Sequence, residues 1–205
     1  MTKLQPGDMA PDFRSTTQDG EPLSLADLRG QRVILYFYPK DTTSGCTLEA
    51  KTLRDGKEEL ARRGFRIIGV SPDSEKSHRN FCARHELNFT LLADTDHSVC
   101  EAYGVWAEKS MYGRKYMGVV RTTFLIDAEG RIERIFDKVD TKNHYQQILD
   151  ACEGDDEPPR RHTPRDRMPG AAPGPAAPGA GDGRHPAHRA GADLGQGPRG
   201  AAALL

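Results

Sequence analysis

Cys46 is the residue of this sequence best placed to do chemistry. It follows Thr43-Ser44-Gly45 and comes shortly after an apolar run, residues 33–38, that reads as a buried strand. A helix is predicted from Cys46 to about Arg63, because Leu48, Leu53 and Leu60 recur at core-compatible spacing and Gly64 is a natural stop. A thiol in the first turn of a helix faces unpaired backbone N–H groups and the positive end of the helix dipole, and both favour the thiolate. The turn is therefore predicted to hold a nucleophile.

The residues around Cys46 in the sequence limit the kind of reaction that its thiol can perform. No second cysteine stands at the Cys-x-x-Cys spacing of a dithiol reductant. Thr43 offers a hydroxyl three residues before the sulfur, and a thiolate beside a hydroxyl suits an oxygen-bearing substrate better than a protein disulfide. On spacing alone, a buried cysteine that only fills space at the start of a helix is an equal alternative, because free cysteine is among the most buried residue types.

Five sequence segments, taken in order along the chain, help to decide between a reactive and a space-filling Cys46. They are residues 38–50 (YPKDTTSGCTLEA), 69–74 (GVSPDS), 103–106 (YGVW), 111–118 (MYGRKYMG) and 121–127 (RTTFLID). Together they resemble the peroxiredoxin family, and within it the bacterioferritin comigratory protein, or peroxiredoxin Q, subfamily. The resemblance covers roughly residues 5–152. A lone Pro-x-x-x-Thr-x-x-Cys pattern is only moderately specific, whereas five ordered blocks that fit one fold are a strong indication.

The resemblance implies roles for four catalytic residues. Cys46 corresponds to the peroxidatic cysteine, whose thiolate attacks the O–O bond of a peroxide and becomes a sulfenic acid. Thr43 corresponds to the threonine that hydrogen-bonds and orients the peroxide. Pro39 corresponds to the proline that shields the sulfur from water and, having no N–H, adds no competing donor. Arg121 corresponds to the arginine that lies beside the thiolate and stabilises charge on the oxygens during transfer.

Two of the charged residues near this motif have simpler interpretations. Without the resemblance, Arg121 reads as a surface ion pair at the start of a strand. Glu49 is a weaker candidate, expected only to favour the first turn of the helix electrostatically.

Cys82 is predicted to be the resolving cysteine, which forms an intramolecular disulfide with Cys46. In one part of the subfamily that thiol lies five residues after the peroxidatic cysteine, where this sequence has Lys51. In another part it lies about 36 residues on, which is the position of Cys82. The alternative is packing, since Cys82 shares a helical face with His78, Phe81 and His85.

The remaining two cysteines receive lesser roles. Cys100 is predicted in the core of a short helix, and Cys152, at the end of the last helix, is the fallback resolving residue.

The elements that must position these residues follow from the apolar pattern. We expect a hairpin over residues 12–25, a brief helix at 26–28, buried strands at 33–38 and 65–70, a helix from 73 or 74 to 86 and apolar residues at 91–92. A short helix at 98–103, a hairpin over 123–138 and a helix over 142–152 complete the domain. This order predicts parallel crossovers followed by an antiparallel pair. It matches a thioredoxin-like three-layer α/β/α sandwich with a mixed central sheet, the fold that the resemblance implies. Sites in such sheets gather at the carboxyl ends of parallel strands, where residues 39–46 lie.

The composition changes sharply near Gly154. In the 52 residues from there to the end, Ala, Gly, Pro and Arg number 11, 10, 9 and 7, and Val, Ile, Phe, Tyr and Trp are absent. Such a segment cannot bury enough apolar area to offset the entropy of ordering it. We therefore predict a peroxiredoxin domain over 1–153 and a disordered tail over 154–205. Because those four residue types are read from GC-only codons, the tail also resembles an out-of-frame read of GC-rich DNA.

Charge and length exclude several classes of partner. The net charge is −1, and the seven arginines of the tail are balanced by six acidic residues, so no nucleic-acid partner is expected. No stretch approaches the roughly 20 apolar residues of a membrane helix, and the first residues lack the apolar core of a signal peptide. Four cysteines without an export signal suit the reducing cytoplasm.

The resemblance implies a thiol-dependent peroxidase acting on hydrogen peroxide and alkyl hydroperoxides, recycled by thioredoxin or a glutaredoxin-type reductant, and serving antioxidant defence and redox homeostasis. A peroxide-responsive redox sensor or holdase with little turnover is the alternative, and a disulfide reductase is disfavoured by the missing Cys-x-x-Cys. No cofactor is expected, and no Cys or His spacing in the domain indicates a metal site. Intramolecular resolution permits a monomer, which is the expected state.

Overall fold

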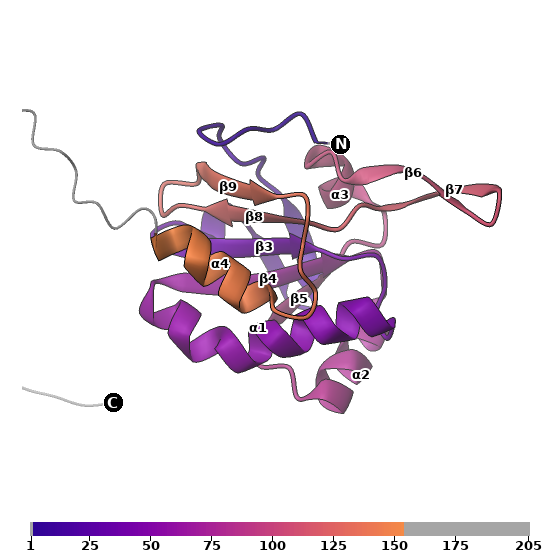
Figure 1. Cartoon of the computed structure of the whole chain (residues 1–205), viewed down its shortest axis with the longest axis horizontal. Helices are drawn as coiled ribbons and strands as arrows, with labels where there is room; N and C mark the ends of the chain where they lie inside the picture. The colour runs from indigo at the N-terminus through magenta and orange to yellow at the C-terminus, as the bar shows by residue number, and fades with distance from the viewer. Residues whose placement is uncertain (1, 154–205) are drawn as a thin grey trace, which may run out of the picture. The chain divides into compact units, whose positions relative to one another are not determined.

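A computed structural model describes residues 2–153 of the chain; the predicted tail, residues 154–205, lies outside the described residues. Its strands are β1 (Arg14–Thr17), β2 (Pro22–Ser24), β3 (Arg32–Phe37), β4 (Phe65–Ser71), β5 (Thr90–Ala93), β6 (Trp106–Met111), β7 (Arg114–Val119), β8 (Thr122–Ile126) and β9 (Ile132–Phe136). Seven of them form one sheet in the order β2-β1-β5-β4-β3-β8-β9 (Figure 1). The neighbours β3, β4 and β5 run parallel, whereas β1, β8 and β9 are antiparallel to the strands they join.

Helices cover both faces of this sheet. They are the 3₁₀ turn η1 (Ala26–Leu28), α1 (Ser44–Arg62), α2 (Glu75–His85), α3 (Ser98–Ala102) and α4 (His144–Glu153). Side chains of α1, α2 and α4 pack in one core cluster, and those of η1 and α3 pack in the other. The predicted thioredoxin-like sandwich with a mixed sheet is confirmed. None of the helices in the described part of the chain combines the length and apolar character that crossing a membrane requires.

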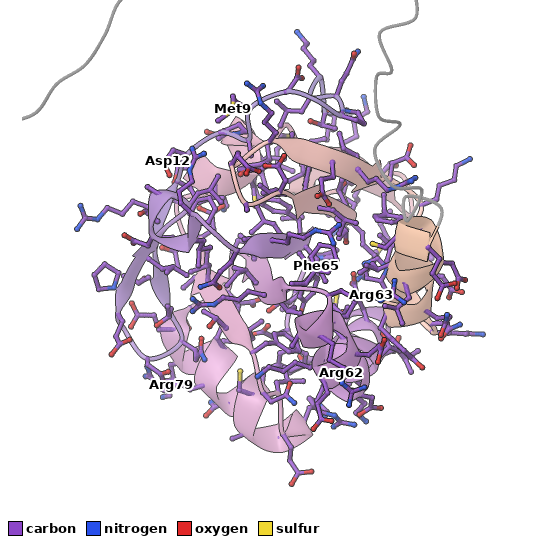
Figure 2. The ribbon with its side chains drawn as sticks, turned by 90° about the vertical axis from the view of Figure 1, so that its left-hand side faces the viewer. Met9, Asp12, Arg62, Arg63, Phe65 and Arg79 are labelled. Carbon is purple, nitrogen blue, oxygen red and sulfur yellow. The ribbon has the colours of Figure 1, made fainter. Side chains whose placement is uncertain are left out.

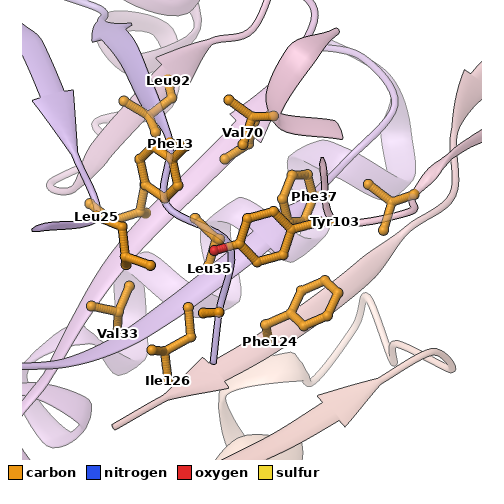
Figure 3. Close-up of a cluster of buried hydrophobic side chains, with 14 of the residues drawn as sticks. Phe13, Leu25, Val33, Leu35, Phe37, Val70, Leu92, Tyr103, Phe124 and Ile126 are labelled. Carbon is orange, nitrogen blue, oxygen red and sulfur yellow. The ribbon is translucent and has the colours of Figure 1, made fainter. Parts of the chain in front are cut away.

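Strand β3 is the centre of the fold because it is buried on both faces. Val33, Leu35 and Phe37 contribute to the cluster on the α3 side, part of which Figure 3 shows. Ile34 and Tyr36 point to the α1 side, as the two-residue period of a strand requires. A strand with apolar residues on both faces must lie inside a covered sheet, which is how the sequence identified it.

Helix α1 differs from the prediction in two details. It begins at Ser44, two residues before the expected start, with Thr43 as its N-cap residue in extended conformation. Its buried stripe is Cys46, Glu49, Ala50, Leu53, Gly56 and Leu60. Leu48 was predicted to face the core and instead is 43% exposed, because that stripe turns its position outward.

The hairpin of β6 and β7 was not predicted. It forms a separate two-stranded sheet that extends away from the rest of the domain (Figure 1). Most of its side chains are exposed, so its sequence lacks the alternation of apolar and polar residues that marks a half-buried strand. Its turn holds Tyr112 and Gly113, both with positive φ, which is the backbone of a tight hairpin connection without the usual Asn-Gly signature.

Gly56 permits the close approach of α1 and α4, and its replacement tests the packing behind the site. A Cβ added at Gly56 would lie 2.7 Å from the Cβ of Tyr145, a contact that side-chain rotation cannot relieve. Gly56→Ala gains about 0.5–1 kcal/mol of helix propensity but costs about 1–3 kcal/mol by overpacking. We expect a net loss of about 1 kcal/mol in the free energy of unfolding, measured by urea denaturation.

The control is the same substitution in a Tyr145→Gly background, where both the ring and the Cβ are gone and Gly56→Ala should be neutral or stabilising. Equal costs in both backgrounds would refute this account of the α1–α4 contact.

Candidate active site

Cys46 lies where the polypeptide passes from the carboxyl end of β3 into α1. It is the third residue of the helix, and only 1% of its surface is exposed. The fold places this turn at the end of the parallel strand pair β3–β4, as predicted for a site in such a sheet.

Arg121 brings a cation to the sulfur from a distant part of the chain. It lies between β7 and β8, and β8 pairs with β3 along its whole length, which carries Arg121 to the end of β3. One guanidinium nitrogen, Nη2, donates to the Cys46 Sγ at 3.2 Å. The other, Nη1, is paired with the carboxylate of Glu49. Burial lowers the pKa of Arg121, but the negative charges of Glu49 and Cys46 outweigh it and leave that pKa above its ordinary value.

Glu49 was predicted only to favour the first turn of the helix electrostatically, and the structure gives it a more specific partner. Its side chain is fully buried one turn after Cys46 and faces the guanidinium of Arg121. Burial raises its pKa from the ordinary 4.5 to about 7, although Arg121 opposes the shift. Within the described residues its Oε1 has no hydrogen-bond partner. The sequence did carry a signal for this position: Glu49 follows Cys46 by three residues, which places the two side chains on the same face of the helix.

His144, from the first turn of α4, closes the site from behind and was not predicted. Its Nε2 lies 2.9 Å from the Thr123 hydroxyl and 3.8 Å from Glu49 Oε1, while Nδ1 faces the Gln147 amide oxygen at 2.9 Å. Burial lowers the pKa of His144 to about 4, so the ring is neutral at physiological pH. A neutral ring donates to Gln147 through Nδ1 and accepts from Thr123 at Nε2, which fixes its tautomer.

Thr43 and Pro39 occupy the loop between β3 and α1. The Thr43 hydroxyl donates to the Lys40 carbonyl at 3.1 Å and caps no helical N–H, so its oxygen keeps lone pairs that can accept a further hydrogen bond. Thr43 is exposed, and Pro39 is half-buried at the start of the loop. The structure therefore brings Cys46 and Arg121 into direct contact, and puts Thr43 and Pro39 on the loop that leads to the sulfur.

Lys109 adds a second cation that the sequence did not reveal. It belongs to β6, and its Nζ donates to the Val119 carbonyl at 2.8 Å across the hairpin. Burial and the charge of Arg121 lower its pKa, and the nearby Cys46 partly offsets them. The base of the hairpin thus contributes positive charge to the surroundings of the sulfur.

All four cysteines are free thiols. Cys82 is half-buried on α2 beside the cluster that contains Cys46. Burial raises its pKa to about 11, and the negative charges of Asp41 and Asp19 add to the shift. Cys100 is completely buried, as predicted, and Cys152 is buried at the end of α4.

One group in the described part of the chain, Asp41, Asp73 and His78, has the ligand atoms and proximity of a metal site. Its polar atoms already have protein partners, however. Asp41 accepts from the hydroxyls of Tyr38 and Ser77, and Asp73 accepts from the Asp41 N–H and from a serine hydroxyl. The prediction considered only Cys and His spacing and overlooked these carboxylates; their hydrogen bonds account for the cluster without a metal.

The sequence matches a family model and curated relatives. Residues 6–135 match the model of the AhpC/TSA family. Peroxiredoxin Bcp of Escherichia coli is 49% identical over 149 residues, covering 73% of this chain and 96% of that protein.

Solved structures agree with this match. Peroxiredoxin Q of Xanthomonas campestris superposes with a TM-score of 0.67 at 36% identity, covering 75% of this chain and 97% of that one. Two further structures are of serine variants of that protein, and the cysteines replaced in the two variants are 36 positions apart. A structure of the bacterioferritin comigratory protein of X. campestris, described for its alkyl peroxide reduction activity, superposes with a TM-score of 0.68 at 34% identity and covers 76% of this chain and 99% of its own.

Glu49 makes the stability of the domain depend on pH. The folded protein keeps a proton on Glu49 between about pH 4.5 and 7, where the unfolded chain has lost it. The contribution of this group to stability is therefore greatest at low pH and is lost progressively as the pH rises through that window. A Glu49→Gln variant, which cannot titrate, should gain on the order of 2 kcal/mol relative to wild type between pH 5 and 8, measured by urea unfolding.

Glu59→Gln is the control, because Glu59 lies on the same helix and is half exposed, with an ion pair to Arg62. A stability difference between wild type and Glu49→Gln that does not change with pH would contradict the buried, raised carboxyl.

Proposed function

Because the chain belongs to the AhpC/TSA family, as a peroxiredoxin of the Bcp and peroxiredoxin Q group, we propose that Cys46 is its peroxidatic cysteine, with Arg121, Thr43 and Pro39 as the other catalytic residues. The protein is a thiol peroxidase, an enzyme that reduces hydroperoxides with electrons from a thioredoxin-type reductant. The observation that carries the residue assignment is the contact of 3.2 Å between the Arg121 guanidinium and the buried Cys46 sulfur.

In the first step the Cys46 thiolate attacks one oxygen of the peroxide. An S–O bond forms, the O–O bond breaks, and the distal oxygen leaves as an alkoxide or hydroxide that takes up a proton to become alcohol or water. The sulfur is oxidised to a sulfenic acid. Arg121 contacts the sulfur before attack and stabilises charge on the two oxygens during transfer, because a guanidinium keeps its charge at any physiological pH.

Thr43 orients the peroxide in this scheme. Its hydroxyl hydrogen is engaged by the Lys40 carbonyl, so its oxygen is an acceptor for the peroxide O–H. Pro39 begins the same loop and offers no N–H to compete for the peroxide oxygens. Glu49 does not reach the peroxide in this scheme and acts on Arg121, as a positioning residue.

Cys82 is proposed as the resolving cysteine. Its thiol condenses with the sulfenic acid of Cys46, so that a disulfide forms and water leaves. Cys46 and Cys82 are 36 positions apart, the separation of the two cysteines replaced in the X. campestris variants. Thioredoxin or a glutaredoxin-type dithiol then reduces the disulfide and completes the cycle.

The remaining assignments complete the proposal. Hydrogen peroxide and alkyl hydroperoxides are the proposed substrates, in line with the alkyl peroxide activity described for the X. campestris protein. A monomer in the cytoplasm is proposed, because resolution within one chain needs no partner subunit and four free thiols suit a reducing compartment. The comparisons do not favour a redox sensor with little turnover.

Thr43→Val tests the orientation of the peroxide. Valine keeps the shape of threonine but removes the acceptor, so kcat/KM for hydrogen peroxide should fall on the order of 100-fold, as for the loss of one hydrogen bond in a transition state. Thr52→Val is the matched control, since the Thr52 hydroxyl bonds only the Glu49 carbonyl within α1. Equal activities of the two variants would remove Thr43 from the catalytic residues.

Peptide mapping after oxidation tests the two cysteine assignments. One equivalent of hydrogen peroxide should produce a Cys46–Cys82 disulfide in wild type, and Cys82→Ser should instead accumulate sulfenic or sulfinic acid on Cys46. Cys152→Ser is the control and should form the same disulfide as wild type. An intramolecular disulfide in Cys82→Ser would transfer the resolving role to another thiol, and an unmodified Cys46 would overturn the peroxidatic assignment.

A further inference from the structure

Asp41, on the loop that leads to Cys46, is the centre of a buried hydrogen-bond cluster that the reaction scheme does not use. Only 1% of its surface is exposed. The Tyr38 hydroxyl donates to Asp41 Oδ1 at 2.7 Å, the Ser77 hydroxyl donates to Oδ2 at 2.8 Å, and His78 Nδ1 lies 2.9 Å from Oδ2. Three side chains, two of them from α2, thus converge on one loop carboxylate.

His78 is held from its other side as well. It is completely buried, and its Nε2 lies 3.0 Å from the Leu92 carbonyl of β5. A carbonyl oxygen can only accept, so Nε2 carries the hydrogen of that contact, while Nδ1 faces Asp41. The ring is therefore fixed between the sheet and the loop.

The backbone of the loop is under constraint at the same place. The Asp41 N–H donates to Asp73 Oδ2 at 2.8 Å, and the Ser71 hydroxyl holds that carboxylate at 2.6 Å. The next residue, Thr42, has φ of 67°, a left-handed conformation that a β-branched residue adopts only when its surroundings impose it. Release of Asp41 would let Thr42 relax, and Thr43 and the first turn of α1 follow directly.

We propose that Asp41 and His78 are positioning residues, a clamp that fixes the loop before Cys46 onto α2 while peroxide reacts and that must open before Cys46 and Cys82 can join. The second half of this proposal rests on the proposed roles of the two cysteines. The clamp bridges the segments that carry them: Asp41 lies five residues before Cys46, and His78 lies one helical turn before Cys82.

The electrostatics of Cys82 agree with this order of events. Burial and the charge of Asp41 raise its pKa, so while the clamp is closed Cys82 stays a thiol and is a poor nucleophile. Opening exposes Cys82 and separates it from Asp41, which returns its pKa toward the ordinary value. The thiol becomes reactive when it becomes able to reach the sulfenic acid.

The clamp therefore controls a competition for the sulfenic acid of Cys46. With the clamp open, the Cys82 thiol attacks, a disulfide forms and water leaves. With the clamp closed, a second peroxide oxidises the sulfenic acid to a sulfinic acid and leaves as alcohol or water. A weaker clamp should shift the outcome toward disulfide, and a stronger one toward sulfinic acid.

The experiment measures the ratio of sulfinic Cys46 to Cys46–Cys82 disulfide by peptide mass mapping after reaction with excess hydrogen peroxide. Asp41→Ala removes the acceptor of three hydrogen bonds and should lower that ratio on the order of tenfold, while also slowing the oxidation of Cys46 because the loop is less ordered. Ser77→Ala removes one donor and should lower the ratio about threefold. Ser77→Ala also carries the test if Asp41→Ala does not fold.

Two controls separate the clamp from a general loss of stability. Asp94→Ala removes an equally buried carboxylate whose hydrogen bonds go to the N–H groups of α3 and not to the loop or to α2. Arg79→Ala frees α2 (Figure 2) from the Gln18 carbonyl without touching the loop. Both should leave the ratio near that of wild type. An unchanged or higher ratio in Asp41→Ala and Ser77→Ala, or an equal fall in Asp94→Ala, would overturn the proposal.

Failure of the clamp and failure of the proposed function give different results. Amide hydrogen exchange in the reduced protein tests clamping without any chemistry: exchange in the first turn of α1 and in α2 should be faster in Asp41→Ala and not in Asp94→Ala. A wild-type disulfide that does not include Cys82 would refute the resolving role and with it the second half of the proposal. Unchanged exchange beside a wild-type Cys46–Cys82 disulfide would refute the clamp alone.

Discussion

The guanidinium of Arg121 makes the contacts on which the site depends, because one cation holds two buried groups of the same helix. Its Nη2 contacts the Cys46 sulfur and its Nη1 pairs with Glu49, both on α1. A buried carboxylate is costly, and a pair of this kind adds little net stability compared with apolar packing. Its value is positional: the planar fork of arginine has donors in two fixed directions, so anchoring one at Glu49 aims the other at the sulfur. Lysine, with a single ammonium, has no such fork.

The fold supplies this arrangement through strand order. Because β8 pairs with β3, the residue just before β8 meets the loop just after β3, and Arg121 meets Cys46. Helix α4 then covers the site, where Gly56 allows it to approach α1 and where His144 stands behind Glu49 as a neutral ring. A neutral histidine leaves Arg121 as the nearest positive partner of Glu49, and the guanidinium stays fixed between Glu49 and the Cys46 sulfur.

The two proposed redox cysteines have opposite surroundings in this structure. Cys46 lies at a helix N-terminus and faces the positive charge of a guanidinium. Cys82 is half-buried on α2, where burial raises its pKa and the negative charge of Asp41 adds to the shift, so its thiol is favoured. In the proposed cycle this asymmetry sets an order, since Cys82 is the less reactive sulfur until the loop and α2 separate.

The sequence by itself determined the parts that depend on local pattern. The apolar run of β3 and the stop at Gly64 located the turn that holds Cys46, and the order of strands and helices gave the fold class. Thr43, Pro39, Arg121 and Cys82 were reached through resemblance in ordered motifs, not through periodicity. Leu48 was assigned to the wrong face of α1, and the start of the helix was missed by two residues. The residues of the first turns mix apolar and polar types, so their pattern fits more than one rotation of the helix about its axis.

Tertiary structure alone decided the partners of those residues. Arg121 is 75 positions from Cys46 and 72 from Glu49, and Asp41 is 37 from His78. Side chains so far apart in the chain meet only through strand pairing and helix packing, and local sequence pattern carries no record of such a meeting. The exposed hairpin of β6 and β7 was not predicted for the complementary reason. Few of its side chains are buried, and it is burial of one face that produces the alternation of apolar and polar residues by which a strand is recognised.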